Sequence, residues 1–386
     1  MQHLYSKEKI RSKRRARLRN KLSGRISVVV ATGLVVSLLI GCAQPTSQPA
    51  PSPKAEAPKA EAPKTEAPKP ATGQATSTIA FKYPEVPKPK KKYTIGAAMV
   101  SSGEAFQESV KWAIEQEAKK YGVDVVILDA GGYGNIAKQT SQMEDLVQRK
   151  VDAIMLWAVS YEGTAPAVDA AVAKRIPVIT FITPSKSGKV STFVAVDDNV
   201  IGQTLAEHQS KAMGGKGNVV MISGGEGAAW SKMRSDGYKK TMKEKYPNIK
   251  ILDEKWTTNL DPATSMKIME DLLQTYPNID GVYCTITGMA YGASKAIDAA
   301  GKRGKITLVG SSIQGKDEIN LLKQGIVSVV TGEPAILSGG WALDYTLKVL
   351  AGEKVPPYVP VPTPVYTKDN VGQADFSLEL APEYLK

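Results

Sequence analysis

The sequence is poor in the residues that build disulfide frameworks and metal sites. It contains two cysteines, Cys42 and Cys284, and two histidines, His3 and His208. One cysteine lies near the N-terminus and the other in an expected strand, which excludes a disulfide framework. His208 stands alone on an expected helix, where a surface or packing role is commoner than a role as metal ligand or general base. We expect no metal site and no cofactor.

Motifs of common enzymes are also missing. The loop Ser101–Glu104, after the first expected strand, lacks the glycine fingerprint of dinucleotide sites, and no Walker A sequence or nucleophile elbow is present. Gly310–Ser312 resembles such an elbow loosely but has no histidine nearby. The glycines at 131–134, 214–217 and 224–227 are interpreted as turns. We expect a binding protein and not an enzyme.

The net positive charge is confined to one end of the chain. The net charge is +12; residues 1–41 account for +9 and residues 42–92 for +5, so residues 93–386 carry −2. A mildly acidic body argues against a nucleic-acid partner. The basic end is better explained by a targeting signal and a tether.

The first 41 residues have the layout of an export signal. The basic segment Lys7–Arg25 precedes the apolar run Ile26–Ile40, which is shorter than the ~20 residues of a spanning helix and suits a signal peptide. The run ends in Leu39–Cys42, which resembles the lipobox of bacterial lipoproteins. This resemblance implies that Cys42 is lipidated and anchors the protein on the extracytoplasmic face of the cell membrane. The alternative is a plain membrane anchor with an accidental cysteine.

Residues 42–92 predict a disordered tether. The pentad Pro53–Ala57 recurs with a period of five as far as Lys69, and proline at this spacing blocks a continuous helix. The segment has too few large apolar residues to bury a core. We expect a semi-extended spacer of ~3 Å per residue where it is polyproline-like.

From Tyr93 onward, short apolar strands alternate with helices. We expect strands at 93–100, 124–128, 153–157, 177–181, 218–223, 249–256, 281–285, 306–311 and 327–331. The expected helices lie near 104–121, 136–149, 165–175, 199–213, 231–245, 262–275, 289–300, 316–323 and 337–350. Strands that are apolar on both faces and joined by helices predict an α/β fold with parallel sheets. Their number favours two doubly wound lobes.

Several segments are similar to the ribose- and galactose-type periplasmic binding proteins, the type I solute receptors of ABC importers. They are Pro177–Thr180, Asp197–Gly202, Arg234–Tyr238, Met289–Ala293 and Leu308–Gly310. Their order and spacing carry the resemblance, which spans residues 93–370. Repressors of the lactose type share this core, but the export signal stands where they carry a helix-turn-helix.

The resemblance implies three crossings between two lobes. We place them near Ala195–Asp198, Thr331–Pro334 and Pro362–Tyr366. One lobe is then 93–195 plus 334–362, and the other is 197–331 plus 363–386. Ligands of doubly wound sheets bind beyond the carboxyl ends of the strands, so the residues that follow each strand are the candidates for ligand contact.

The resemblance and the strand ends indicate the same ligand-binding candidates. They are Glu104, Phe106, Tyr133, Trp157, Tyr161, Trp230, Arg234, Thr287, Tyr291, Ser312, Gln314 and Glu333, with Ser102 and Asp129 beside them. Aromatic faces would cover an apolar or cationic part of a ligand, and polar groups would orient it. Phe106 and Trp157 have an alternative as core residues, and Arg234 as a solvated charge. Asp197 is interpreted as a helix cap or hinge residue, and Trp256 and Trp341 as packing residues.

At several positions the residue differs from the one usual in sugar-binding members of the family, and these differences affect which solute is expected. Sugar-binding members usually show Asn-Asp at Ile286-Thr287, an aspartate at Ser312 and Asp-Arg at Ile182-Thr183. Carboxylates and amides read sugar hydroxyls with bidentate bonds. We expect a lipid-anchored monomer that closes on a sugar or a sugar-like, amphipathic solute and delivers it to an ABC permease. The alternative is a sensor, like the trimethylamine N-oxide receptors of the same superfamily, that signals to a receptor kinase.

Overall fold

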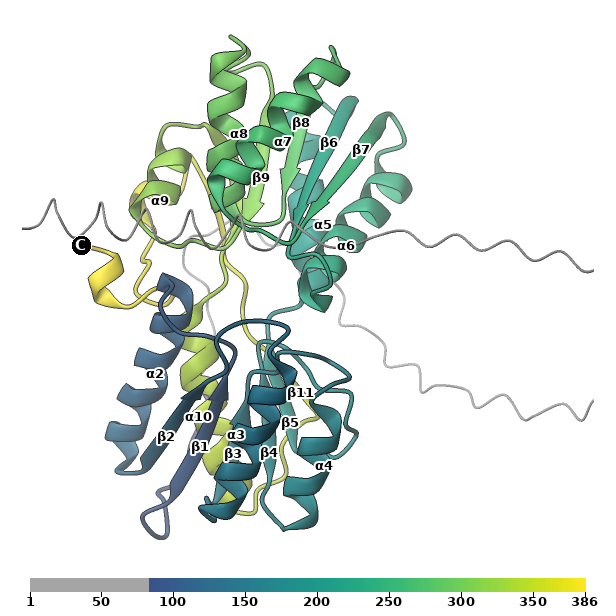
Figure 1. Cartoon of the computed structure of the whole chain (residues 1–386). Coiled ribbons are helices and arrows are strands. Elements are labelled where there is room, and N and C mark those ends of the chain that lie inside the picture. Colours follow the sequence, from purple (N-terminus) through teal and green to yellow (C-terminus); the bar gives the residue numbers. More distant parts are fainter. Residues whose placement is uncertain (1–82) are drawn as a thin grey trace, which may run out of the picture. The chain divides into compact units, whose positions relative to one another are not determined.

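The structure, a computed structural model, describes residues 83–386, and the predicted signal peptide, Cys42 and most of the predicted tether lie outside that range. Residues 83–92 precede the first strand without regular secondary structure. From Thr94 onward the chain forms two six-stranded sheets, each flanked by helices (Figure 1). We call each sheet with its helices a half of the molecule.

The first half holds six parallel strands in the order β11-β5-β4-β3-β1-β2. The strands are β1 (Thr94–Met99), β2 (Asp124–Asp129), β3 (Ala153–Leu156), β4 (Val178–Phe181), β5 (Thr192–Ala195) and β11 (Tyr358–Pro360). The helices are α2 (Ala105–Tyr121), α3 (Ile136–Gln148), α4 (Ala165–Ala173) and α10 (Ala335–Leu350). The outer strand β11 comes from far along the chain and pairs with β5.

The second half repeats this plan in the order β12-β10-β9-β8-β6-β7, with β12 antiparallel to β10 and the other pairs parallel. The strands are β6 (Gly217–Gly224), β7 (Ile249–Thr257), β8 (Gly281–Cys284), β9 (Thr307–Ser311), β10 (Val327–Thr331) and β12 (Val365–Thr367). The helices are α5 (Asp198–Ala212), α6 (Ala229–Lys245), α7 (Pro262–Thr275), α8 (Thr287–Ala299) and α9 (Lys316–Lys323). Short 3-10 turns follow at Val371–Gln373 and Pro382–Tyr384.

Successive strand residues alternate between two cores. In β1, Ile95 and Ala97 pack in the core that contains residues of α2 and α10, whereas Ala98 packs in a core with residues of α3 and α4. In β6, Val219 packs toward α5 and α6, and Val220 packs toward α7 and α8. Helices therefore cover both faces of both sheets, which explains why the strands are apolar on both sides.

Three segments connect the halves. They lie between β5 and α5, between β10 and α10, and between β11 and β12. The predicted fold class, two doubly wound α/β lobes joined by three crossings, is confirmed. Three strands of three or four residues, β5, β11 and β12, were not predicted from the sequence. Such short segments have too little periodicity to be recognised, and the outer strand β11 is a strand through its pairing with β5 alone, which itself pairs with β4.

The C-terminal tail contacts both halves. Leu380 packs in the core of the second half, and the ring of Phe376 lies 4.9 Å from that of Tyr366 in β12. In the first half, the N–H groups of Ala335 and Ile336 in α10 donate to tail carbonyls, and the Ala381 N–H donates to the hydroxyl of Ser109 in α2 at 2.9 Å. The tail thus provides a link between the halves besides the three crossings.

Candidate functional site

Residues at the strand ends of both halves line a single cavity of about 700 Å³. Trp157 follows β3 and Ile182 follows β4 in the first half, and Ser312 follows β9 in the second. Glu333, two residues after β10, contributes from a crossing. This is the edge at which ligands of open α/β sheets bind, and the two halves share it.

Two lining residues have a strained backbone. Ile182 has a φ of 60° and Ser312 a φ of 63°, in the left-handed region that side chains with a Cβ seldom adopt. Each directly follows a middle strand of its own sheet. Strain of this kind persists where the surrounding structure imposes it, and it concentrates at functional sites. Its occurrence at equivalent places in both halves supports this cavity as the site.

An aromatic wall belongs to the first half. The ring of Trp157 lies 5.8 Å from that of Phe106 in an edge-to-face arrangement, and 5.9 Å from that of Phe181. Its indole N–H donates to the hydroxyl of Tyr133 at 3.2 Å. Tyr133 stands on the glycine-rich loop after β2 and is 44 % exposed, whereas Trp157 is 2 % exposed. Edge-to-face packing orients the buried ring of Trp157, and the more exposed Tyr133 extends the aromatic wall toward the surface.

A second cavity of about 600 Å³ adjoins the first, because Tyr133 and Trp230 line both. Tyr161 lies in its first-half wall, and residues 225–229 of the second half form the opposite side. Trp230 lies on the first turn of α6 with the guanidinium carbon of Arg234 4.8 Å from its ring centre. The buried indole N–H of Trp230 has no hydrogen-bond partner among residues 83–386.

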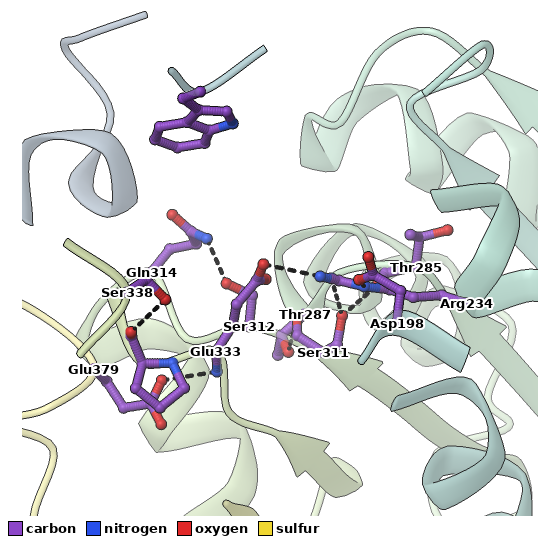
Figure 2. A network of polar contacts seen from close by, with 12 residues as sticks. Asp198, Arg234, Thr285, Thr287, Ser311, Ser312, Gln314, Glu333, Ser338 and Glu379 are labelled. Carbon is purple, nitrogen blue, oxygen red and sulfur yellow. Dashed lines mark hydrogen bonds and ion pairs between the residues drawn. The ribbon is translucent and has the colours of Figure 1, made fainter. Parts of the chain in front are cut away.

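Arg234 is the centre of a buried polar network (Figure 2). Its Nε donates to Asp198 Oδ1 and its Nη1 to Ser311 Oγ, both at 2.8 Å, and its Nη2 forms an ion pair with Glu333 Oε1 at 2.9 Å. The side chains of Arg234, Asp198 and Glu333 are 1 %, 5 % and 11 % exposed. Bonds in three directions hold the guanidinium in place at the wall of the cavity.

The network carries more negative than positive charge. Burial raises the pKa of Asp198 to about 7; Arg234 opposes this effect and Glu333 adds to it. Burial by itself would lower the pKa of Arg234, but the neighbouring Glu333 and Asp198 raise it. The arginine therefore stays charged, and its charge is already matched by two carboxyl groups.

Close contact between two helices brings Asp198 and Arg234 together. Asp198 opens α5, whose N-terminus is capped by Asp197, and Arg234 lies on α6. A Cβ added to Gly202 of α5 would lie 1.9 Å from the Arg234 carbonyl oxygen, and one added to Gly237 of α6 would lie 2.4 Å from the Asn199 carbonyl oxygen. Only glycine at these two positions lets the helices approach closely enough for the ion pair.

The crossing that carries Glu333 is fixed from behind by Glu379 of the C-terminal tail. Glu379 is 1 % exposed and accepts hydrogen bonds from the Glu333 N–H and the Tyr366 hydroxyl, both at 2.9 Å. Burial raises the pKa of Glu379 to about 7. The tail thereby positions a residue of the cavity.

Most of the predicted ligand-binding residues line one of the two cavities. They are Glu104, Phe106, Tyr133, Trp157, Tyr161, Trp230, Arg234, Ser312, Gln314 and Glu333. Thr287 and Tyr291 do not line either. Thr287 is fully buried and donates to the Ser311 carbonyl at 2.9 Å, and Tyr291 stacks with Lys295 one turn further along α8.

Other residues considered from the sequence lie elsewhere. The carboxylate of Asp129 accepts hydrogen bonds from Ser102 and from the Gly131 N–H, and it does not line the cavities. Trp256 lines a small side pocket, and Trp341 is buried within α10. Of these, Asp197 caps α5 by accepting from two backbone N–H groups, which confirms its interpretation as a helix cap.

Several residues of the second half that line the main cavity were not predicted from the sequence. The loop after β7 contributes Thr258, Leu260 and Asp261, and the start of α9 contributes Glu318. The rule that ligands bind beyond the carboxyl ends of strands also applies to the loop after β7, so the sequence did contain a signal for these residues. Asp198 was missed because its function depends on a partner 36 residues further along the chain.

Within residues 83–386, no three His, Cys, Asp or Glu side chains gather closely enough to hold a metal ion. In the same range, no helix is long and apolar enough to cross a membrane. The thiol of Cys284 is buried in β8, and burial raises its pKa, so it is a packing residue and not a reactive nucleophile. The geometry is that of a binding cleft.

Two sheets with facing strand ends and a shared cavity define a class of two-lobed α/β binding proteins. Consistent with that class, the profile of a family described as periplasmic binding protein domain matches residues 95–354. The chain belongs to this family. Its members bind substrates without converting them and are extracytoplasmic, and the prediction of a binding protein without enzymatic activity is confirmed.

Individual relatives agree with this assignment. The ribose import binding protein RbsB of Bacillus subtilis is 31 % identical over 279 residues, which are 72 % of this chain and 88 % of that protein. The xylitol-binding protein of Mycolicibacterium smegmatis is 31 % identical over 277 residues, 70 % of this chain and 76 % of its own. A carbohydrate transporter solute-binding protein of Agrobacterium radiobacter, solved in complex with D-arabinose, superposes with a TM-score of 0.68 at 26 % identity. The match covers 75 % of this chain and 99 % of that one.

Proposed function

We propose that this protein is the substrate-binding lipoprotein of an ABC importer, which closes on a small polar solute and presents it to the membrane permease. The observation that carries the proposal is the cavity of about 700 Å³ lined by both halves and by the crossing residue Glu333. A solute that touches both halves stabilises the closed arrangement by its higher affinity for that state. The proposed lobes, 93–195 plus 334–362 and 197–331 plus 363–386, turn about the three crossings.

The solute class is proposed from the relatives and from the polar groups of the cavity. The names of two relatives and the ligand of one solved complex are those of ribose, xylitol and D-arabinose, all small polyhydroxylated molecules. In this chain the guanidinium of Arg234 has five N–H groups, of which two donate to Asp198 and Ser311, while Nη2 forms an ion pair with Glu333. The remaining N–H groups of the guanidinium and the indole N–H of Trp230 are suited to donate to solute hydroxyls.

The site is proposed to enclose the solute between aromatic and polar walls. Phe106 and Trp157 would pack on its apolar face from the first half, while Arg234, Ser312 and Gln314 would bind its polar groups from the second. Export and anchoring are proposed from the lipobox at Cys42, and the protein is proposed to act as a monomer tethered at the membrane.

Calorimetry and scattering test this proposal together. The full-length protein in detergent is titrated with ribose, xylitol, arabinose and related polyols and amino sugars, and small-angle X-ray scattering is recorded with and without each. We expect saturable heat with at least one solute and a smaller radius of gyration in its presence. Binding without compaction would contradict the closing mechanism, and turnover of the solute, followed by mass spectrometry, would contradict the binding role.

A further inference from the structure

Most of the charged side chains that line the main cavity are carboxylates. Glu104, Asp261, Glu318 and Glu333 contribute four acids, and Arg234 is the single basic residue among the lining residues that the structure describes. Asp198 adds a fifth carboxyl group directly behind Arg234. Burial raises the pKa of Asp198 and of Glu318, but even with these two left out of the count, Glu333 balances the arginine, and Glu104 and Asp261 leave a surplus of negative charge that repels anionic solutes.

Part of the cavity lining is apolar. Ile182 and Ile286 occupy loop positions after β4 and β8 and offer a solute no hydrogen-bonding side chain. The rings of Phe106, Trp157, Tyr133 and Trp230 line the same space. Aromatic faces attract cations as well as apolar groups, and the attraction grows where water is excluded.

Two buried polar atoms of the cavity residues have no partner among residues 83–386. One is an acceptor, Gln107 Oε1, whose amide nitrogen donates to Glu104 Oε2 at 3.0 Å. The other is a donor, Trp230 Nε1. Buried polar groups are normally satisfied, so a solute that supplies both an N–H donor and an oxygen acceptor would complete the site.

We propose that the cavity takes a small organic cation that also carries hydroxyl groups, such as an amino sugar or an amino polyol, in preference to the neutral or acidic counterpart. This assignment rests on the proposed binding function and specifies its substrate class. The protonated amine lies on the acidic side with Glu104 and Gln107, and the hydroxyl groups accept from Arg234 and Trp230.

Matched solutes test the charge directly. The full-length protein in detergent is titrated calorimetrically at pH 7 with glucosamine and glucose, with galactosamine and galactose, and with glucamine and sorbitol; glucuronate serves as the acidic probe. We expect at least one amine to bind about tenfold or more tightly than its neutral partner, with an affinity that falls as salt rises. Glucuronate is expected not to bind.

A pair of single substitutions supplies the control. Glu104→Gln removes one carboxylate from the cavity lining at the residue before α2, and Glu115→Gln removes one from the exposed face of α2. Glu104→Gln is expected to weaken the amine about fivefold and its neutral partner less, so that the preference for the amine falls, in keeping with one partly exposed charge pair. Glu115→Gln is expected to change neither, and both variants should keep the unfolding midpoint of the parent.

The possible outcomes distinguish the cation assignment from the proposed binding function on which it rests. If neutral members bind as tightly as the amines, or more tightly, and still compact the protein, the cation assignment is wrong and the proposed function stands. Equal effects of the two glutamate substitutions would likewise overturn the assignment. If no member of either series binds or compacts the protein, both the assignment and the proposed function fail.

Discussion

Arg234 shows how one buried residue joins stability to binding. It is among the largest fully buried side chains of the described chain; its hydrogen bonds reach α5 and β9, and an ion pair reaches the crossing after β10. A buried ion pair contributes little net stability, but removing one partner leaves the other charge unpaired. The arginine therefore serves mainly to hold three segments at the cavity in one arrangement.

Arg234→Met is expected to lower the free energy of unfolding by about 3–5 kcal/mol, because Asp198 and Glu333 then remain buried without their cation. Urea titration followed by circular dichroism measures the change. Lys232→Met is the matched control, because Lys232 lies two residues earlier on α6 in an exposed pair with Asp236, and it is expected to cost less than about 1 kcal/mol. Similar losses in the two variants would refute this role of Arg234.

Glu379 gives stability a pH dependence of defined sign. Its pKa is raised to about 7 in the folded protein, whereas an unfolded glutamate titrates near ~4.3. Between these values the folded state holds a proton that the unfolded state has lost. The contribution of Glu379 is fully present below about pH 4 and is lost as the pH rises through the folded pKa near 7, so stability falls across this window.

Glu379→Gln is expected to remove the share of this pH dependence that Glu379 contributes, while the share of Asp198, whose pKa is also raised to about 7, remains. The neutral amide has the same shape and can still accept from the Glu333 N–H, so the loss of stability between pH 4.5 and pH 7.5, roughly 3 kcal/mol from this group, should shrink. Urea unfolding at pH 4.5, 6.0 and 7.5 provides the comparison, with the exposed Glu383→Gln of the same tail as control. An unchanged pH profile would show that Glu379 is not the responsible group.

At the scale of elements, the contact of α5 with α6 determines the site. Gly202→Ala would place a methyl group 1.9 Å from the Arg234 carbonyl oxygen, so the helices must separate and the Arg234–Asp198 ion pair must lengthen. We expect a loss of about 1–3 kcal/mol in stability together with at least tenfold weaker solute binding. Urea titration and calorimetry measure the two effects.

The control for this substitution is another glycine inside a helix. Gly340 lies within α10, and a Cβ there would meet only Glu117 Cγ, at 3.4 Å. Gly340→Ala is expected to be neutral or to stabilise by up to about 1 kcal/mol, since alanine is the better helix former. If Gly202→Ala behaves in the same way as Gly340→Ala, the close approach of α5 and α6 does not control the site.

Elements could be predicted where their pattern is local. The apolar strand at 218–223 and the helix at 262–275 follow from periodicity, and their predicted bounds differ from those observed by two residues or fewer. Side-chain direction could not be predicted as well. Ile286 and Gly288 line the cavity while Thr287 between them turns toward Ser311, and one residue of register at the start of α8 decides which of them faces the solute.

At the scale of the whole molecule, the site exists only where distant segments meet. Its residues come from loops after β2, β3, β4, β7, β8 and β9, from α2, α6, α7, α8 and α9, and from one crossing. The strand-end rule located Trp157 and Ser312 because it uses only order along the chain. It could not reveal that Glu379 supports Glu333 from 46 residues away, since such pairing depends on the path of the tail.

The proposed anchor makes a last prediction about the whole molecule. A thioether lipid requires the thiol of Cys42, and a diacylated terminus binds membranes stably because each buried methylene adds about 0.8 kcal/mol. Cys42→Ser is therefore expected to move the protein from the membrane fraction to the soluble fraction without changing its affinity for solute. Cell fractionation and immunoblotting measure the first effect, and calorimetry measures the second.

Cys284→Ser is the matched control, because Cys284 is the other cysteine of the chain and lies buried in β8. If the Cys42 variant stays in the membrane fraction and is released only by detergent, the apolar run before it, and not a lipid, holds the protein there.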